Sequence, residues 1–513
     1  MKKLPAFILS IILAIFFLTP AYGREVSLRI LYVNDFHGFA EPYQPTGSQE
    51  KLGGAASLAR EVKRLRQGKP TLLLAAGDMI QGHSWATFFQ GRSSIALMNL
   101  MRFDAMVVGN HEFDFGQDVL KKRIAAARFP VLGANVEGFK DGLKPYVIKT
   151  IQGLKVAIIG VVTPDTPQAT HPGNVAGLKF LPPAPVVEKY LPELKKRADL
   201  VLVLSHLGYQ ADRDLAAKAP GVAVIVGGHS HTKLLEPAVV GDTIVVQAWE
   251  HAKALGVLDL TVEDGKIKNF SGRLQMIKPA AGREDKEVRT LVKKYAARVN
   301  AVLGEKIGEA ALDLDGEHVR AQETNLGDLL ADVLRQAAGA QAVIINGGGI
   351  RAGIPKGTIA VKDIYSVLPF DNYLVAIRLT GKQIREALEH GVSGLEEGAG
   401  RFPQVSGLSF IYSRRAPAGS RVKEIVIGGQ PLDPRKEYVV ATNDFMAAGG
   451  DGYRAFGEAL KSSPDFACTG GMLQGEKLVY NDAGRWLRDV VIDYIRRQKT
   501  VAPQVNGRIK QID

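Results

Sequence analysis

Short apolar runs, separated by polar and glycine-rich segments, repeat through the first half of the chain. The runs are rich in Val, Ile and Leu and cover residues 28–33, 71–76, 105–108, 155–162, 200–204 and 222–226. A helical spacing of apolar positions, as in residues 54–65, lies between some of them. Continuous apolar strands with intervening helices are typical of α/β folds built on a buried, largely parallel sheet. Residues 26–277 are therefore predicted to form an α/β unit.

The pattern changes between residues 284 and 303, where apolar side chains recur at three- and four-residue steps and Lys and Arg fill the other face. This spacing predicts an amphipathic helix, either a connection between two domains or a surface helix of the first. A second α/β pattern follows. It predicts a helix over 326–338, strands over 342–345, 374–379, 408–412, 422–427 and 438–441, and a final amphipathic helix from about 482 to 498.

The first 23 residues have the features of a secretory signal peptide. Lys2 and Lys3 precede a 13-residue apolar stretch, 6–18, and small residues at Ala21 and Gly23 suit cleavage. The stretch is shorter than the roughly 18 apolar residues of a membrane helix, although an uncleaved N-terminal anchor is the alternative. No cysteine follows it, which excludes a lipoprotein anchor. We expect secretion across the inner membrane and a periplasmic or extracellular protein from about Arg24, without a stable membrane anchor.

Composition and charge narrow the class of protein. The apolar fraction is 46% and the charged fraction 23%, which is ordinary for a globular protein and excludes wholesale disorder. The single cysteine, Cys468, excludes an intramolecular disulfide and a thiolate metal site. The formal charge of +12 attracts anions. Because there is no long basic block and no alternation of aromatic and basic residues, no nucleic-acid partner is expected, whereas small anionic substrates are compatible.

Polar side chains follow five of the predicted strands at the point where each strand ends. They are Asp35 and His37, Asp78, Asn110 and His111, His206, and His229 and His231. Taken singly, each has an ordinary interpretation as a hydrogen-bonded histidine, a helix N-cap or a turn residue. Because ligands of open α/β sheets bind at the carboxyl ends of strands, however, these eight groups are predicted to converge on one edge.

Imidazole and carboxylate ligands without sulfur suit zinc, manganese, iron or cobalt, and eight donors are too many for one tetrahedral ion. Two cations sharing a carboxylate would use them, and such a pair clamps the attacking and leaving oxygens of a phosphoryl transfer. The other histidines, at positions 83, 171, 251, 318 and 390, keep a structural interpretation. Glu112 follows His111 as in a zincin motif, but Phe115 stands where the second histidine would be.

Other catalytic signatures are absent from the sequence. The three Gly-Lys pairs are followed by Pro70, Ile267 and Gln383, which excludes a phosphate-binding Walker A motif. Residues 228–232 lack the closing glycine of a nucleophile elbow. The glycines at 347–349 do not spell a dinucleotide-binding fingerprint.

The metal motifs resemble those of the calcineurin-like metallophosphoesterases, and the whole chain after the signal peptide is similar to the secreted bacterial 5′-nucleotidase family, which includes UDP-sugar hydrolases. The matching segments are 35–38, 77–78, 109–114 and 228–231 in the first region, and 346–351, 368–370, 443–445 and 449–452 in the second. The resemblance implies an N-terminal αββα-sandwich metallophosphoesterase domain over 24–282, a linker helix over 283–303, and a smaller C-terminal α/β substrate-binding domain over 304–513.

The resemblance also implies roles for single residues. One divalent cation would be held by Asp35, His37, Asp78 and His231, and a second by Asp78, Asn110, His206 and His229. Zinc or manganese is expected before cobalt, iron or magnesium. His111 would stabilise the transferring phosphoryl group, and Asp114 would orient His111. In the second region the base would lie between Phe370 and Phe445, for which core packing is the alternative from the residues alone. The ribose and neighbouring polar groups would contact Asn346, Arg351, Asp451 and Arg320.

The expected activity is hydrolysis of nucleoside 5′-phosphates to nucleoside and phosphate with two divalent metal ions. Broad base specificity is expected because stacking on aromatic rings tolerates different bases. UDP-sugars and 2′,3′-cyclic nucleotides are alternative substrates on the same fold. A nucleotide-binding protein without catalysis is a distant alternative, since it would be expected to have lost metal ligands. The oligomeric state is not predicted.

Overall fold

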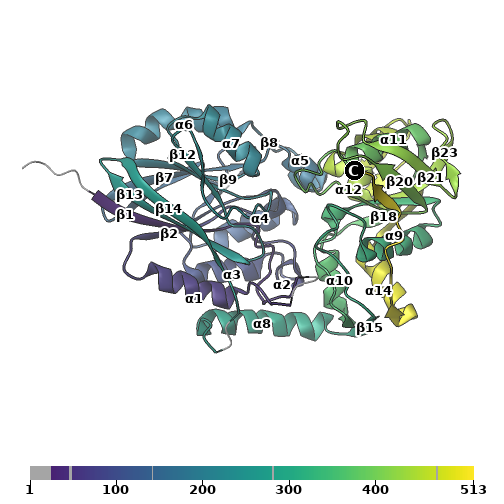
Figure 1. Ribbon diagram of the computed structural model, residues 1–513, viewed down its shortest axis with the longest axis horizontal. Coiled ribbons are helices and arrows are strands. Elements are labelled where there is room, and N and C mark those ends of the chain that lie inside the picture. The colour runs from purple at the N-terminus through teal and green to yellow at the C-terminus, as the bar shows by residue number, and fades with distance from the viewer. Residues whose placement is uncertain (1–24, 46–48, 141, 280–281, 470–471) are drawn as a thin grey trace, which may run out of the picture.

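The computed structural model describes residues 25–45, 49–140, 142–279, 282–469 and 472–513, and the predicted signal peptide lies outside them. The described residues form two α/β bodies that lie side by side along the long axis (Figure 1). Helix α8 (Lys286–Leu303) runs along one side of both. No helix of the described residues is long and apolar enough to cross a membrane.

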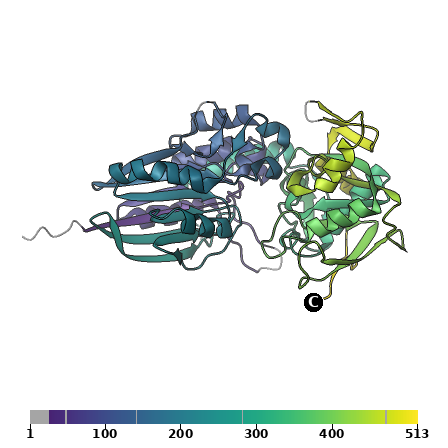
Figure 2. The same ribbon diagram turned by 90° about the horizontal axis from the view of Figure 1, so that it is seen from above.

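The N-terminal body contains two stacked six-stranded sheets (Figure 2). In the first, the order is β14 (Lys266–Met276), β13 (Ala254–Glu263), β1 (Glu25–Val33), β2 (Thr71–Ala75), β3 (Ala105–Val107) and β4 (Val131–Leu132). In the second, it is β11 (Ala238–Val240), β12 (Thr243–Gln247), β10 (Val224–Gly227), β9 (Leu200–His206), β7 (Leu154–Val162) and β6 (Tyr146–Ile151). The central strands are parallel and β13, β14, β6 and β11 pair antiparallel.

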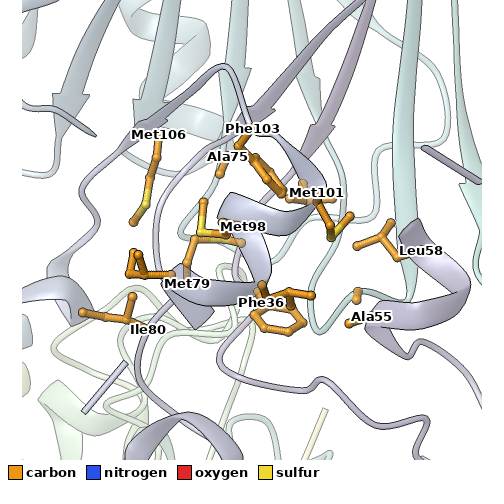
Figure 3. Close-up of a cluster of buried hydrophobic side chains, with 14 of the residues drawn as sticks. Phe36, Ala55, Leu58, Ala75, Met79, Ile80, Met98, Met101, Phe103 and Met106 are labelled. Atoms are coloured by element: carbon orange, nitrogen blue, oxygen red, sulfur yellow. The ribbon is translucent and has the colours of Figure 1, made fainter. Parts of the chain in front are cut away.

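Helices cover the outer face of each sheet, which gives four layers. They are α1 (Ala55–Arg66), α3 (Arg92–Met101) and α4 (Gln117–Ala126) on the first sheet, and α6 (Pro183–Arg197) and α7 (Tyr209–Lys218) on the second. Alternate residues of β1 explain the continuous apolar runs: Leu31 faces the helices, where Met98 and Leu58 pack (Figure 3), and Ile30 faces the other sheet. A strand with both faces buried has no polar side. The four layers, helices, two sheets and helices, confirm the expected αββα sandwich.

The predicted strands of this body appear as β1, β2, β3, β7, β9 and β10. The apolar pattern predicted a single sheet, but there are two; each is largely parallel, as predicted, with antiparallel strands at its edges. The edge strands β6, β11 and β14 lack the continuous apolar pattern because they are partly exposed; β14 is exposed or half-buried along its whole length.

Helix α8 belongs to the cores of both bodies. Asp285 caps its N-terminus, accepting a hydrogen bond from the Val288 amide at 2.9 Å. The first half of α8 packs on the N-terminal body through Val292 and Tyr295, and its last turns pack on the C-terminal body through Val299 and Leu303. The helix is therefore a connection and a packed surface helix at once.

The C-terminal body is built on a five-stranded sheet in the order β19 (Pro403–Ser406), β16 (Ala342–Asn346), β23 (Glu437–Asn443), β18 (Tyr373–Thr380) and β26 (Leu478–Trp486). One face is covered by α9 (Asn325–Ala338), α10 (Val361–Val367) and α14 (Leu487–Gln498), and the other by α11 (Gly381–Gly391) and α13 (Arg454–Lys461). A smaller sheet contains β20 (Leu408–Tyr412), β21 (Val422–Ile427), β22 (Gln430–Pro431) and β28 (Ile509–Gln511).

The final predicted helix begins too early. Residues 482–486 belong to β26, which pairs antiparallel with β18, and α14 begins only at Leu487. Pairing with a central strand overrides the helical spacing of these few residues.

Candidate dimetal active site

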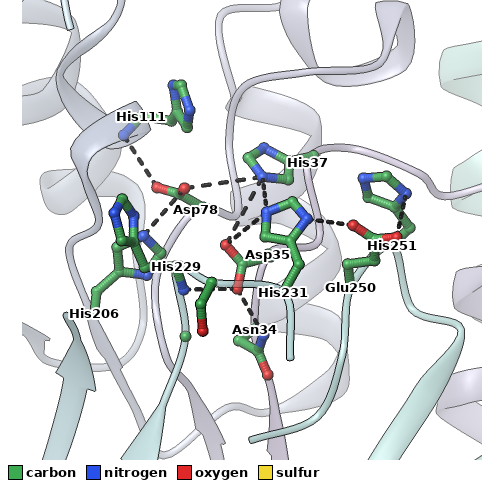
Figure 4. A network of polar contacts seen from close by, with 12 residues as sticks. Asn34, Asp35, His37, Asp78, His111, His206, His229, His231, Glu250 and His251 are labelled. Atoms are coloured by element: carbon green, nitrogen blue, oxygen red, sulfur yellow. Dashed lines mark hydrogen bonds and ion pairs between the residues drawn. The ribbon is translucent and has the colours of Figure 1, made fainter. Parts of the chain in front are cut away.

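The polar strand ends of both sheets meet at one place between them (Figure 4). Asp35, Asp78 and Asn110 follow strands of the first sheet, whereas His206, His229 and His231 end or follow strands of the second. The sequence therefore predicted the convergence of these residues but not that the two sheets share it.

Two groups of donor atoms lie in this cluster. The first is Asp35, His37 and His231, and the second is Asp78, His206 and His229; in each, the donor atoms lie within 4.8 Å of one another. Asp78 lies next to both groups, since its Oδ2 is 3.1 Å from His206 Nε2 and 3.8 Å from His37 Nε2. Asn110, also predicted, is buried in the short helix η1 (Asn110–Phe113) that follows β3.

The outer nitrogens of three histidines are held by hydrogen-bond acceptors. His37 Nδ1 lies 2.9 Å from the Gln81 carbonyl oxygen, His206 Nδ1 lies 2.6 Å from the Ala76 carbonyl oxygen, and His231 Nδ1 contacts the Glu250 carboxylate. An acceptor at Nδ1 places the proton there and leaves the Nε2 lone pair for a metal. The Nε2 atoms are the ones that face the carboxylates of the cluster.

The donors fit a pair of divalent cations. His37 Nε2 and His231 Nε2 lie 3.3 Å apart, so two lone pairs face each other. In the described part of the chain, Asp35 Oδ1, Asn110 Oδ1 and His206 Nε2 are buried without a hydrogen-bond partner. Unpaired buried polar groups are costly, and divalent cations would satisfy all of these atoms.

Electrostatics also favour positive charge here. Burial alone lowers the pKa of His206, but the neighbouring Asp78 and Asp35 carboxylates outweigh it and raise that pKa to about 10. Burial and the nearby charge of His206 lower the pKa of His229 to about 3. The carboxylates thus favour positive charge in the cluster, which cations would supply.

The backbone is bent to bring these side chains inward. Asp35, His37, Asp78, His229 and His231 all have positive φ, between 47° and 77°. Such strain in non-glycine residues is characteristic of functional sites. Neighbouring glycines permit the close approach: a Cβ atom at residue 109 would overlap the Asp78 carboxylate, and one at residue 77 or 228 would meet the His206 ring.

A second set of polar residues, which sequence reasoning missed, holds the donors in place. The Glu112 carboxylate accepts backbone N–H groups from Asp78 and Met79 at 2.8 Å and from Gly109, which ties two donor loops together. Asn34 Nδ2 donates to Asp35 Oδ2 at 2.6 Å. Asn34 immediately precedes a predicted ligand, which was a usable signal, whereas Glu112 was considered only as part of a zincin motif.

The loop that follows β10 is braced from β12. Gln247 accepts hydrogen bonds from the Ser230 hydroxyl and the Thr232 amide, and donates to the Gly228 carbonyl oxygen at 2.9 Å. Three residues further on, Glu250 contacts His231 and also accepts from Lys253 Nζ at 2.7 Å. These residues follow an apolar run, 244–246, that ends like the predicted strands, so the pattern itself offered the signal.

His111 and Asp114 lie beside the donor groups, as predicted. Asp114 Oδ2 is 2.6 Å from His111 Nδ1, and its Oδ1 accepts a hydrogen bond from the Thr170 hydroxyl at 2.6 Å. The His111 amide donates to Asp78 Oδ1 at 3.0 Å. The imidazole is thus fixed on one side by a carboxylate, and its ring lies 5.6 Å from that of Phe370 in the C-terminal body.

Arg351 brings the C-terminal body directly to the cluster. Its Nη2 donates to His37 Nε2 at 2.9 Å, although the side chain comes from the turn after β16. Cation binding at this nitrogen requires the guanidinium to release it. Burial, with a contribution from nearby Arg320, lowers the pKa of Arg351 to about 10, so it stays charged at neutral pH.

Of the other predicted substrate residues, Asn346 and Phe370 line a neighbouring pocket. The rest of its lining includes Asn372, Asn443 and Leu487. Asn346 donates to Asp451 Oδ2 at 2.6 Å and accepts from Asn443 at 3.0 Å. Phe445 is not part of this lining and is only 9% exposed, with its ring where a Cβ atom of residue 450 would lie.

The histidines given a structural interpretation differ in their surroundings. His251 stacks on Phe39 at 3.9 Å and lies in a third group of donors with His231 and Glu250, so it borders the site. His83 caps α2 (Ser84–Thr87), and His390 Nε2 lies 2.7 Å from the Asp451 carbonyl oxygen. Of the remaining two, His171 Nε2 lies 3.9 Å from Asp444 Oδ2, and His318 Nδ1 lies 2.8 Å from Asp315 Oδ2.

Two family models match the chain: the calcineurin-like phosphoesterase over residues 28–233 and the 5′-nucleotidase C-terminal domain over residues 305–458. Together with the paired donor groups, they define a metal-dependent phosphoric ester hydrolase of the dimetal phosphoesterase fold.

Known proteins of the same overall length give the family. A 5′-nucleotidase precursor from Thermus thermophilus, of solved structure, is 38% identical with a TM-score of 0.85, over 95% of this chain and 99% of its own. Human 5′-nucleotidase is 30% identical, over 96% of this chain and 92% of its own length. The chain belongs to the 5′-nucleotidase family. It is also 32% identical to the trifunctional nucleotide phosphoesterase protein YfkN of Bacillus subtilis, of whose length it spans only 35%.

Proposed function

We propose that the protein hydrolyses nucleoside 5′-phosphates to nucleoside and phosphate, with residues 24–282 carrying the metal centre and residues 304–513 the nucleotide site. The observation that carries this proposal is the juxtaposition of two donor groups around Asp78 with Arg351 and Phe370 of the C-terminal body. The 5.6 Å between the rings of His111 and Phe370 supports binding of one nucleotide across both regions.

Asp35, His37, Asp78 and His231 would hold one cation, and Asp78, Asn110, His206 and His229 the other. Bound divalent cations would activate water and neutralise the charge that develops on the phosphoryl oxygens. Nitrogen and oxygen donors without sulfur favour zinc or manganese over harder cations that prefer oxygen alone.

The chain's own side chains would complete the stabilisation. The His111 imidazole, oriented by Asp114, donates a hydrogen bond to a phosphoryl oxygen as negative charge builds up. Arg351, once it leaves His37, adds a planar cation that suits a phosphate. Support for both roles comes from their contacts with the donor groups.

On the nucleoside side, the base would lie between Phe370 and Phe445. Stacking is indifferent to base identity, which supports broad specificity. Asn346, Asp451 and Arg320 would contact the ribose; the hydrogen bond between Asn346 and Asp451 supports their acting together.

The assay compares substrates and metals. The purified chain from Arg24 onward is incubated with AMP, UDP-glucose and 2′,3′-cyclic AMP over zinc, manganese, cobalt and magnesium, and released phosphate and nucleoside are measured. AMP is expected to be the best substrate. Preference for UDP-glucose or the cyclic nucleotide would replace the proposed substrate class. AMP binding without phosphate release under every metal would overturn catalysis itself.

We also propose that the protein is secreted through its N-terminal signal peptide. The charged and apolar pattern of residues 1–23 supports this. Fractionation of the producing cells, with mass determination of the N-terminus, tests it: a periplasmic or extracellular chain beginning near Arg24 is expected, and an intact Met1 terminus in the cytoplasm would refute it.

A further inference from the structure

The segment that carries Phe370 is held from behind by the start of α14. Phe370, Asp371 and Asn372 connect α10 to β18, and Asp371 is exposed. The amide of Leu487 donates to the Asn372 carbonyl oxygen at 2.8 Å. Next to it, Arg488 donates from Nη1 to the Phe370 carbonyl oxygen at 3.0 Å and from Nη2 to the Asp371 carboxylate.

The Arg488 guanidinium is itself fixed. The residue is only 6% exposed, and its guanidinium carbon lies 4.5 Å from the centre of the Tyr365 ring on α10 and 5.8 Å from that of Trp486. A planar cation packed close to two aromatic rings has few orientations open to it. Its two N–H donors therefore point at fixed acceptors.

The backbone that Arg488 holds forms part of the pocket wall. Phe370 and Leu487 both line it, and the Phe370 ring reaches across to His111. We propose that Arg488 is a positioning residue for base recognition: by fixing the backbone of Phe370 it holds the ring at the angle that a nucleobase stacks on. This rests on the proposed function, in which Phe370 contacts the base.

The inference separates base binding from phosphate chemistry, because Arg488 has no contact in the described residues with the donor cluster, His111 or Arg351. Loss of these hydrogen bonds should therefore weaken the binding of ligands that carry a base and leave the binding of inorganic phosphate unchanged. A purely structural role, in contrast, would affect both alike.

The experiment uses the full chain from Arg24 with zinc or manganese, and compares Arg488→Gln and Arg488→Lys with Phe370→Ala. For Phe370→Ala the KM for AMP is expected to rise about tenfold or more, as loss of one stacking partner implies. For Arg488→Gln we expect a rise of about three- to fivefold in the KM for AMP and in the inhibition constant of adenosine. The kcat for AMP and the inhibition constant of inorganic phosphate should stay within about twofold. Arg488→Lys keeps the charge but loses the paired N–H donors of the guanidinium, so its constants for AMP and adenosine should lie between those of Arg488→Gln and wild type.

The matched control is Arg496→Gln on the same helix, whose guanidinium pairs with Glu305 at 2.9 Å away from the pocket. It should leave every constant unchanged. The double variant Arg488→Gln with Phe370→Ala should be no worse than Phe370→Ala alone, because one residue acts through the other.

Three results would overturn the inference: equal weakening of adenosine and phosphate, additive effects in the double variant, or unchanged AMP and adenosine constants. Each leaves wild-type AMP hydrolysis as it is, so failure here is distinct from failure of the proposed function. If Arg488→Gln unfolds on purification, Arg488→Lys and its double variant with Phe370→Ala provide the same comparison.

Discussion

The contact between His111 and Asp114 can be tested by Asp114→Asn, which removes one charge and little else. The asparagine can still accept the His111 Nδ1 proton, and the Thr170 hydroxyl can rotate to suit it. What is lost is the charge of a short contact, 2.6 Å, between side chains that are only 12% and 8% exposed. A hydrogen bond to a charged group contributes roughly 1.5–3 kcal/mol and a neutral one about 1 kcal/mol. The difference, roughly 0.5–2 kcal/mol, corresponds to a loss of about 2- to 30-fold in kcat for AMP.

Steady-state phosphate release from AMP measures this loss, with bound metal determined on the same samples so that a change in loading is not mistaken for it. His111→Ala should cost at least about a hundredfold, and Asp114→Asn should cost nothing further in that background. Asp118→Asn, at a carboxylate that is 89% exposed on the next helix, is the matched control. A kcat within twofold of wild type for Asp114→Asn, or a full additional loss in the His111→Ala background, would refute the reasoning.

Three further predictions concern the metal centre and the C-terminal core. Glu250→Gln should weaken zinc binding about tenfold, because it weakens the acceptor that orients His231. Competition with a chromophoric chelator measures the zinc affinity, and Glu236→Gln, at an exposed residue, is the control. Unchanged zinc affinity in Glu250→Gln would contradict the prediction. Removing the cations with a chelator should abolish AMP hydrolysis and lower the unfolding temperature, both restored by zinc or manganese; activity that persists in metal-free protein would contradict it. Burial and the nearby Glu323, opposed by Arg508, raise the pKa of Asp328 to about 8, so this group's contribution to the free energy of unfolding falls as the pH rises from about 4 to about 8. Asp328→Asn should therefore reduce the loss of unfolding temperature between pH 5.5 and 8, and an unchanged slope in thermal melts would show that this carboxyl is not the source.

The sequence was most informative where strands are buried on both faces. Runs such as 28–33 and 200–204 have no polar side to confuse them, and they appear as β1 and β9. It was least informative at partly exposed edge strands and at 482–486, where positions are only exposed or half-buried and pairing with a neighbouring strand decides the outcome. The spacing of apolar residues within a segment does not indicate which strand will pair with it.

The donor residues were accessible for the same reason, since each follows a recognisable strand. Some residues that act through the backbone were not accessible in this way. Glu112 accepts backbone amides of another loop, and Arg488 reaches back more than a hundred positions to Phe370. A carboxylate or guanidinium whose partners are backbone atoms leaves no spacing to detect, so such residues emerge only when the chain is folded.

The three glycines that border the donor cluster bear on how enzymes of this architecture can diversify. No larger residue fits at 77, 109 or 228 without displacing Asp78 or His206. The chemistry is consequently frozen in one half of the molecule, where even a methyl group is refused. Changes in what is cleaved are therefore expected in the loops of the other body that we propose contact the nucleoside, such as the one that carries Phe370, whereas the loop that carries Arg351 stays tied to the donor cluster.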